Sequence, residues 1–69
     1  MTNFKASVKN RETKECTVVE SAYANKTDFI KDLRANGYMV NPDKVKKSEV
    51  FDYIIDNTNC QSFDWKENN

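Results

Sequence analysis

A strict alternation of apolar and polar residues near the start of the chain restricts its fold more than any other feature. In residues 3–9, NFKASVK, every second residue from Phe4 onward is apolar. A period of two is typical of a β-strand with one buried face. The polar stretch 10–14 then predicts a turn. The β-branched stretch 15–20, ECTVVE, predicts the second strand of a hairpin.

The next segment carries the signals of one short amphipathic helix. Asn25 suits the N-cap, and Asp28 lies three residues later, where a carboxylate can complete a capping box. Phe29, Ile30 and Leu33 share one side of the expected helix. This side is predicted to pack against the sheet.

The only glycine, Gly37, follows that helix. A phosphate-binding loop precedes a helix and contains several glycines. A single glycine after a helix is typical of the C′ position, where left-handed backbone is needed. We therefore expect the helix to end near Asn36 and Gly37 to bind no ligand.

A second helix is expected after two short extended stretches. Residues 38–40 predict a third strand, and residues 45–47 predict either a fourth strand or the approach to this helix. Ser48 is the expected N-cap, with Glu49 in the first turn. The apolar side, which should face the sheet, comprises Val50, Phe51, Ile54, Ile55 and Thr58.

The order β-β-α-β-α predicts one α+β domain over residues 1–69. We expect a small, mainly antiparallel three-stranded sheet, with or without the short fourth strand, and two helices packed on one face. Phe63 and Trp65 either seal the core or form an exposed anchor, and residues 66–69 should fray. A chain of this length buries roughly 60% of its unfolded surface, which leaves little room for a deep pocket.

Charge and hydropathy predict a cytoplasmic protein. Eleven basic and eleven acidic residues cancel, so net charge gives no general attraction to nucleic acid or anionic lipid. No apolar run reaches the roughly 20 residues that span a membrane, and residues 1–5 lack the apolar segment of a signal peptide. We therefore expect Cys16 and Cys60 to be reduced, with a bridge between them as the less favoured alternative.

Few residues are suited to catalysis. The chain has no histidine, the commonest general base and metal ligand. Two cysteines far apart in sequence cannot supply the roughly four ligands of structural zinc. We expect no enzymatic activity, no metal and no cofactor.

Basic residues form two clusters in the sequence. If the first and third strands are neighbours, the clusters merge on the sheet face that the helices leave open, where they could contact phosphates. Lysines on exposed strands also prevent edge-to-edge aggregation, and arginine is too scarce for good base recognition. The candidate nucleic-acid contacts are Lys5, Lys9, Arg11, Lys14, Lys44, Lys46 and Lys47.

A second candidate surface is acidic. Spacings of three and four place Glu49, Asp52 and Asp56 along one ridge of the expected second helix. The ridge either docks a basic partner surface, imitating a phosphate backbone, or is a solvated helix face. The candidate protein contacts are Glu49, Asp52, Tyr53, Asp56 and Trp65.

Most of the chain resembles a group of small proteins of unknown function. The segments LRANGY (33–38), VFDYI (50–54) and FDWK (63–66) resemble proteins encoded on plasmids, conjugative elements and phages of Gram-positive bacteria. The resemblance implies a cytoplasmic, mobile-element origin and no particular activity. We expect a non-enzymatic module that binds protein partners, itself included. The alternatives are a sheet-face nucleic-acid-binding accessory protein and an acidic-ridge inhibitor of a host DNA-binding protein.

Overall fold

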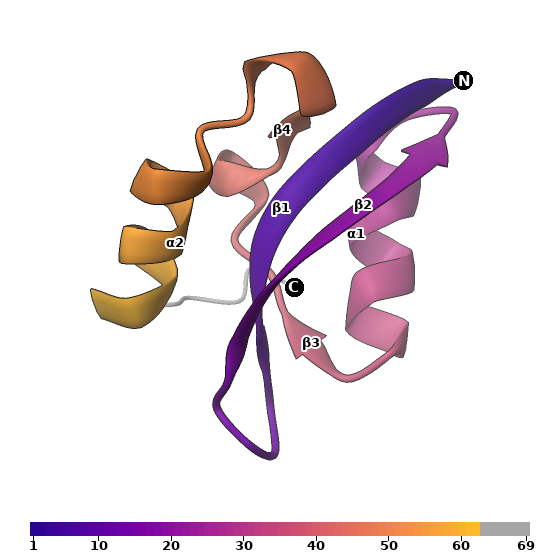
Figure 1. The fold of residues 1–69 in the computed structure, drawn as a ribbon. Helices are drawn as coiled ribbons and strands as arrows, with labels where there is room; N and C mark the ends of the chain where they lie inside the picture. Colours follow the sequence, from indigo (N-terminus) through magenta and orange to yellow (C-terminus); the bar gives the residue numbers. More distant parts are fainter. Residues whose placement is uncertain (63–69) are drawn as a thin grey trace.

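One long strand organises the fold (Figure 1). The computed structural model describes residues 1–62, in which β1 (Thr2–Asn10) pairs antiparallel with β2 (Cys16–Tyr23) over its length. On the other edge of β1, β3 (Tyr38–Met39) pairs with its C-terminal end and β4 (Lys46–Lys47) with its N-terminal half, both antiparallel. The strand order is β2-β1-β3, with β4 also beside β1. The hairpin and the short fourth strand are confirmed.

The hairpin turn is built around Asn10. Its side-chain oxygen accepts hydrogen bonds from the backbone N–H groups of Glu12 and Thr13, at 2.8 and 3.1 Å. Its backbone N–H donates to the carbonyl of Glu15 at 2.9 Å. Lys14 takes a left-handed φ of 64°, which reverses the chain within a few residues. The turn predicted from the polarity of residues 10–14 is confirmed.

The first helix, α1 (Lys26–Ala35), begins and ends where the sequence predicts. The side chain of Asn25 accepts a hydrogen bond from the backbone N–H of Asp28 at 2.9 Å, as an N-cap does. After the C-cap residue Asn36, Gly37 has a φ of 89°, the left-handed conformation expected at C′.

The hydrophobic core lies between α1 and one face of the sheet. The Phe29 ring of α1 lies 6.1 Å from the ring of Phe4 and 5.2 Å from that of Tyr23, measured between centroids. The Tyr23 hydroxyl donates a hydrogen bond to the Asp32 carboxylate, which ties the end of β2 to α1. The buried core residues are Phe4, Ala6, Val8, Phe29, Ile30, Leu33, Val40 and Val45.

The second helix starts later than expected. After the 3₁₀ turn η1 (Pro42–Lys44) and β4, a second 3₁₀ turn, η2 (Ser48–Val50), is followed by extended backbone at Phe51. The helix α2 (Tyr53–Ser62) begins only after that. Ser48 was therefore wrongly assigned as its N-cap, because its hydroxyl donates to the carboxylate of Glu20 in β2.

Asp52 caps α2 instead. Its side-chain oxygen accepts hydrogen bonds from the backbone N–H groups of Ile54 and Ile55, at 3.0 and 3.2 Å. An aspartate immediately before the first helical residue satisfies two N–H groups that would otherwise lack acceptors.

The two helices lie on opposite faces of the sheet (Figure 1). In β1, Lys5, Ser7 and Lys9 alternate with the core residues and therefore point away from α1. Cys16 pairs with Lys9 in the register and is bonded to Cys60 of α2, so α2 covers this second face. The α+β class, the mainly antiparallel sheet and the element order are confirmed. The placement of both helices on one face is wrong, because the bond holds α2 on the polar face.

Two further expectations concern the ends of the chain and the membrane. Among residues 1–62, no helix is long and apolar enough to cross a bilayer. The expected packing of Phe63 and Trp65 and the fraying of residues 66–69 concern residues outside the described part of the chain.

Candidate interaction surface

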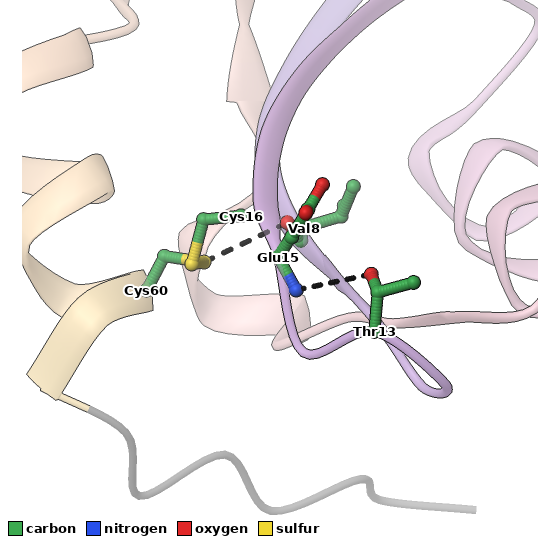
Figure 2. The surroundings of a disulfide bond; sticks show 5 residues. All are labelled: Val8, Thr13, Glu15, Cys16 and Cys60. Atoms are coloured by element: carbon green, nitrogen blue, oxygen red, sulfur yellow. Dashed lines mark hydrogen bonds between the residues drawn. A yellow bond between two sulfur atoms is a disulfide. The ribbon is translucent and has the colours of Figure 1, made fainter.

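A disulfide bond between Cys16 and Cys60 joins β2 to α2 (Figure 2). The two Cα atoms lie 6.2 Å apart, within the range that a disulfide requires. The expectation of two reduced cysteines is wrong for this structure. Sequence separation says nothing of proximity, whereas the hairpin register places Cys16 on the face that α2 covers. The bond therefore links the first hairpin to the last helix.

The surroundings of the bond are well packed. Cys60 is completely buried, and its Sγ lies 3.6 Å from the carbonyl oxygen of Val8 (Figure 2). A disulfide sulfur has no proton to donate, so this separation is a packing contact. Just before Cys16, the backbone N–H of Glu15 donates to the hydroxyl of Thr13 at 3.3 Å. The turn thus holds Cys16 in place.

Cys60 and Asp56 lie on the side of α2 that faces the sheet. Asp56 precedes Cys60 by four residues and therefore lies on the same side of the helix, one turn away. Its exposed fraction is 1%. Within residues 1–62, neither of its carboxylate oxygens has a hydrogen-bond partner, and the buried hydroxyl oxygen of Ser7 has none either. Burying an ionised carboxylate without a partner costs several kcal/mol.

The apolar residues of the same segment point outward. The exposed fraction is 75% for Ile54, 56% for Ile55, 63% for Val50 and 55% for Tyr53. We call these four residues the α2 apolar surface. The prediction that the apolar side of this helix packs on the sheet is wrong, since the side that carries Asp56 and Cys60 packs there.

The segment before α2 is held to the sheet by two side-chain contacts. The Lys5 ammonium nitrogen lies 5.9 Å from the centroid of the Phe51 ring, within cation–π range. Ser48 donates to Glu20, the residue opposite Lys5 on β2. On the other side of Lys5, β4 places Lys46 directly opposite. Lys5 thus lies between a carboxylate, an ammonium group and an aromatic ring.

The predicted basic patch is only partly assembled. Lys5 and Lys46 are neighbours across β1 and β4, but Lys9 is buried on the face that α2 covers. The open sheet face on which the two clusters were expected to merge is thus occupied by α2. The remaining candidates are in or near the connections: Arg11, Lys14 and Lys47 are exposed, and Lys44 is half-buried.

A shallow cleft separates the hairpin from the start of α2. Its volume is ≈ 490 Å³, and its lining comprises Lys9, Lys14, Glu15, Cys16, Tyr53 and Asn57. In the described part of the chain, no group of three or more histidine, cysteine, aspartate or glutamate side chains could hold a metal ion. The cleft brings Cys16 close to the surface, next to the exposed Lys14.

The predicted acidic ridge is not formed. Glu49 is exposed in η2, Asp52 caps α2, and Asp56 is buried against the sheet. The ridge required one continuous helix through these residues, and the extended backbone at Phe51 interrupts it. Tyr53 is exposed as expected, and Trp65 lies outside the described residues.

Sequence reasoning missed the two features that define this surface, namely the bond and the outward side of α2. Cys60 lies within α2, which extends to Ser62, and the register of Cys16 shows that the side carrying Asp56 and Cys60 faces inward. Comparison of the chain with protein-family models, curated proteins and solved structures finds no match.

Proposed function

We propose that this chain is a non-enzymatic interaction module that associates with a second copy of itself through the α2 apolar surface. The observation that carries the proposal is the outward position of Ile54 and Ile55 on a helix whose inward side holds Asp56 and Cys60. A small protein gains stability by covering such side chains, since each buried Å² of apolar area contributes about 25 cal/mol.

The size of the surface supports a protein partner. From their exposed fractions, its four residues together expose on the order of 500 Å², about half of it from Ile54 and Ile55. A standard interface buries about 800 Å² on each partner, so this surface would form its centre and the surrounding polar residues its rim.

The chemistry of the surface supports a second copy as the partner. A twofold contact brings the same patch of both molecules together. The exposed α2 residues Ile54, Ile55 and Thr58 carry no charge, so a twofold contact centred on them would place the exposed carboxylates of Glu49 and Asp52 at its rim. The net charge of zero adds no long-range repulsion between copies.

The cellular setting of the module is part of the proposal. The resemblance of the LRANGY and VFDYI segments supports an origin on a mobile genetic element and a cytoplasmic location. In the cytoplasm, glutathione and thioredoxin systems keep most thiols reduced, so the bond between Cys16 and Cys60 would exchange with cellular thiols there. The oxidised form, on which the proposed self-association rests, would therefore form there only under oxidising conditions.

Sedimentation equilibrium on the oxidised chain tests the proposal. We expect a dimer at micromolar concentration, and a monomer after the double substitution Ile54→Lys and Ile55→Lys. The matched control is Thr17→Lys with Ala35→Lys, which adds the same charge at exposed positions of β2 and α1. This control should remain dimeric. A monomeric wild type at millimolar concentration would refute the proposal, and so would a control that dissociates while the α2 variant does not.

A further inference from the structure

We infer that the Cys16–Cys60 disulfide sets which side of α2 faces the sheet, so that its reduction turns Ile54 and Ile55 inward and removes them from the α2 apolar surface. The effect on association rests on the proposed function. The reorientation of the helix does not, because it follows from the packing of this chain alone.

With the bond closed, the orientation of α2 is fixed. Cys16 is held by its register opposite Lys9 and by the hydrogen-bonded turn that precedes it. Cys60, in the last turn of α2, must point toward Cys16. Asp56 lies one turn earlier on the same side of α2, so it is buried between α2 and the sheet although its carboxylate is better solvated in water.

Without the bond, the packing favours the opposite orientation. The carboxylate of Asp56 has no hydrogen-bond partner within the described residues, and a rotation of α2 by roughly half a turn would return it to water and bury Ile54 and Ile55. The sheet face beneath has apolar area to receive them, from the half-buried Val18 and from the alkyl chain of Lys5. Hydration of the Asp56 carboxylate and burial of the Ile54 and Ile55 side chains both favour the rotated helix.

The chain has a hinge at the required place. The backbone at Phe51 is extended, with φ −72° and ψ 127°, and separates η2 from α2. The hydrogen bond from Ser48 to Glu20 and the contact of Phe51 with Lys5 hold η2 on the sheet. Rotation about residues 51 and 52 therefore turns α2 without displacing β4 or η2.

The bond is open to a dithiol reductant from one side. Cys60 is buried, whereas Cys16 is half-buried and lines the cleft beside the exposed Lys14, whose charge favours the approach of a thiolate. A thiolate of the dithiol attacks the Cys16 sulfur, forms a mixed disulfide and releases Cys60 as a thiolate that takes up a proton. The second thiolate of the dithiol then displaces Cys16. The dithiol becomes a disulfide, and both cysteines become thiols.

The experiment compares the full chain before and after treatment with dithiothreitol. Because the proposed dimer would itself cover Ile54 and Ile55, the readout is their contact with the sheet: methyl NMR measures nuclear Overhauser effects from Ile54 and Ile55 to Val18 of β2, and a soluble paramagnetic agent measures the accessibility of the core residue Ile30. We expect the effects to Val18 to appear on reduction and the accessibility of Ile30 to stay low. The double variant Cys16→Ser and Cys60→Ser should show the reduced pattern without any reductant.

Three outcomes would overturn the inference. The first is the absence of contact between Ile54 and Val18 in both redox states, with Ile30 still protected. The second is loss of Ile30 protection on reduction, which would mean that the core unfolds without the bond and that the bond only stabilises the fold. The third is a serine variant that keeps the oxidised pattern.

Sedimentation on the same samples separates this inference from the proposed function. New contact of Ile54 with Val18 on reduction, in a chain that is monomeric in both states, supports the inference and refutes self-association. A dimer that persists in both states without that contact supports self-association and refutes the inference. Both ideas together predict a dimer when oxidised and a monomer when reduced.

Discussion

Asp56 and Cys60 lie one turn apart on the sheet-facing side of α2, and both are buried. The burial of Cys60 is explained by its disulfide bond with Cys16, whereas Asp56 has no interaction within the described residues that favours its burial. The burial of Asp56 is then a consequence of the bond. No group within residues 1–62 satisfies this carboxylate, and its burial there lowers the stability of the oxidised protein.

Replacing Asp56 with leucine should therefore stabilise the oxidised protein. Removing a buried acceptor without partners raises the free energy of unfolding by about 1–3 kcal/mol. Denaturant unfolding without reductant measures the change. The matched control is Asp52→Ala, which removes an aspartate from the same segment but loses the N-cap, and should lower stability by about 1 kcal/mol. A loss of stability in Asp56→Leu would show that the carboxylate has a stabilising partner.

The contact between Lys5 and Phe51 should contribute to holding η2 on the sheet. A double-mutant cycle with Lys5→Met and Phe51→Leu keeps apolar bulk at both positions and isolates the cation–π term. We expect a coupling energy of about 0.5–1 kcal/mol in denaturant unfolding. Lys5→Arg, which retains the cation, should keep most of it. Additive effects of the two substitutions would mean that the 5.9 Å contact contributes nothing measurable.

Local signals in the sequence predicted the central strand and the first helix. The alternation around Phe4 indicated the strand, and Asn25 and Gly37 indicated the two ends of α1. The turn built around Asn10 was predicted by a local signal too. These signals depend on neighbours within a few residues, whereas the equally local N-cap signal at Ser48 was overruled by its hydrogen bond to the distant Glu20.

The candidate surface could not be predicted in the same way. The hydrophobic pattern of residues 50–58 has two possible orientations on a sheet, and the usual rule buries the apolar one. Here the bond between Cys16 and Cys60 selects the other. The proximity of the two cysteines depends on strand register and on the face that α2 covers, which are properties of the assembled sheet. The predicted acidic ridge around Asp56 was wrong for a related reason. The spacing of the acidic residues does not reveal that extended backbone at Phe51 interrupts the helix.

Gly37 should tolerate a side chain poorly, although there is space for one. A Cβ built at this position meets no atom within 4 Å, so a substitution causes no clash. The φ of 89° is nevertheless costly for an L-residue, and Gly37→Ala should lower the free energy of unfolding by about 1–2 kcal/mol. Gly37→Asn should lose less, since asparagine tolerates left-handed backbone. Equal losses for both variants in denaturant unfolding would point to a cause other than backbone conformation.

The hydrogen bond from Tyr23 to Asp32 should make stability depend on pH in the alkaline range. This bond is the largest cause of a raised Tyr23 pKa, from an ordinary value of 10.0, and partial burial and the negative charge of Asp32 act in the same direction. A raised pKa means that folding favours the protonated phenol. The stabilising contribution is complete below pH 10.0, the ordinary value, and is lost as the pH rises through the higher folded value. Other groups titrate in the same range, so the comparison must be between variants.

Denaturant midpoints from about pH 8 to about pH 11 test this dependence. Tyr23→Phe removes the titrating group and should lose stability less steeply above pH 10.0 than the wild type does. Asp32→Asn should bring the pKa of Tyr23 back toward 10.0, seen in the tyrosinate absorbance as the difference from the same variant carrying Tyr23→Phe. Parallel curves for wild type and Tyr23→Phe would show that Tyr23 ionises equally easily in the folded and unfolded chains, and the bond to Asp32 would then contribute no pH dependence.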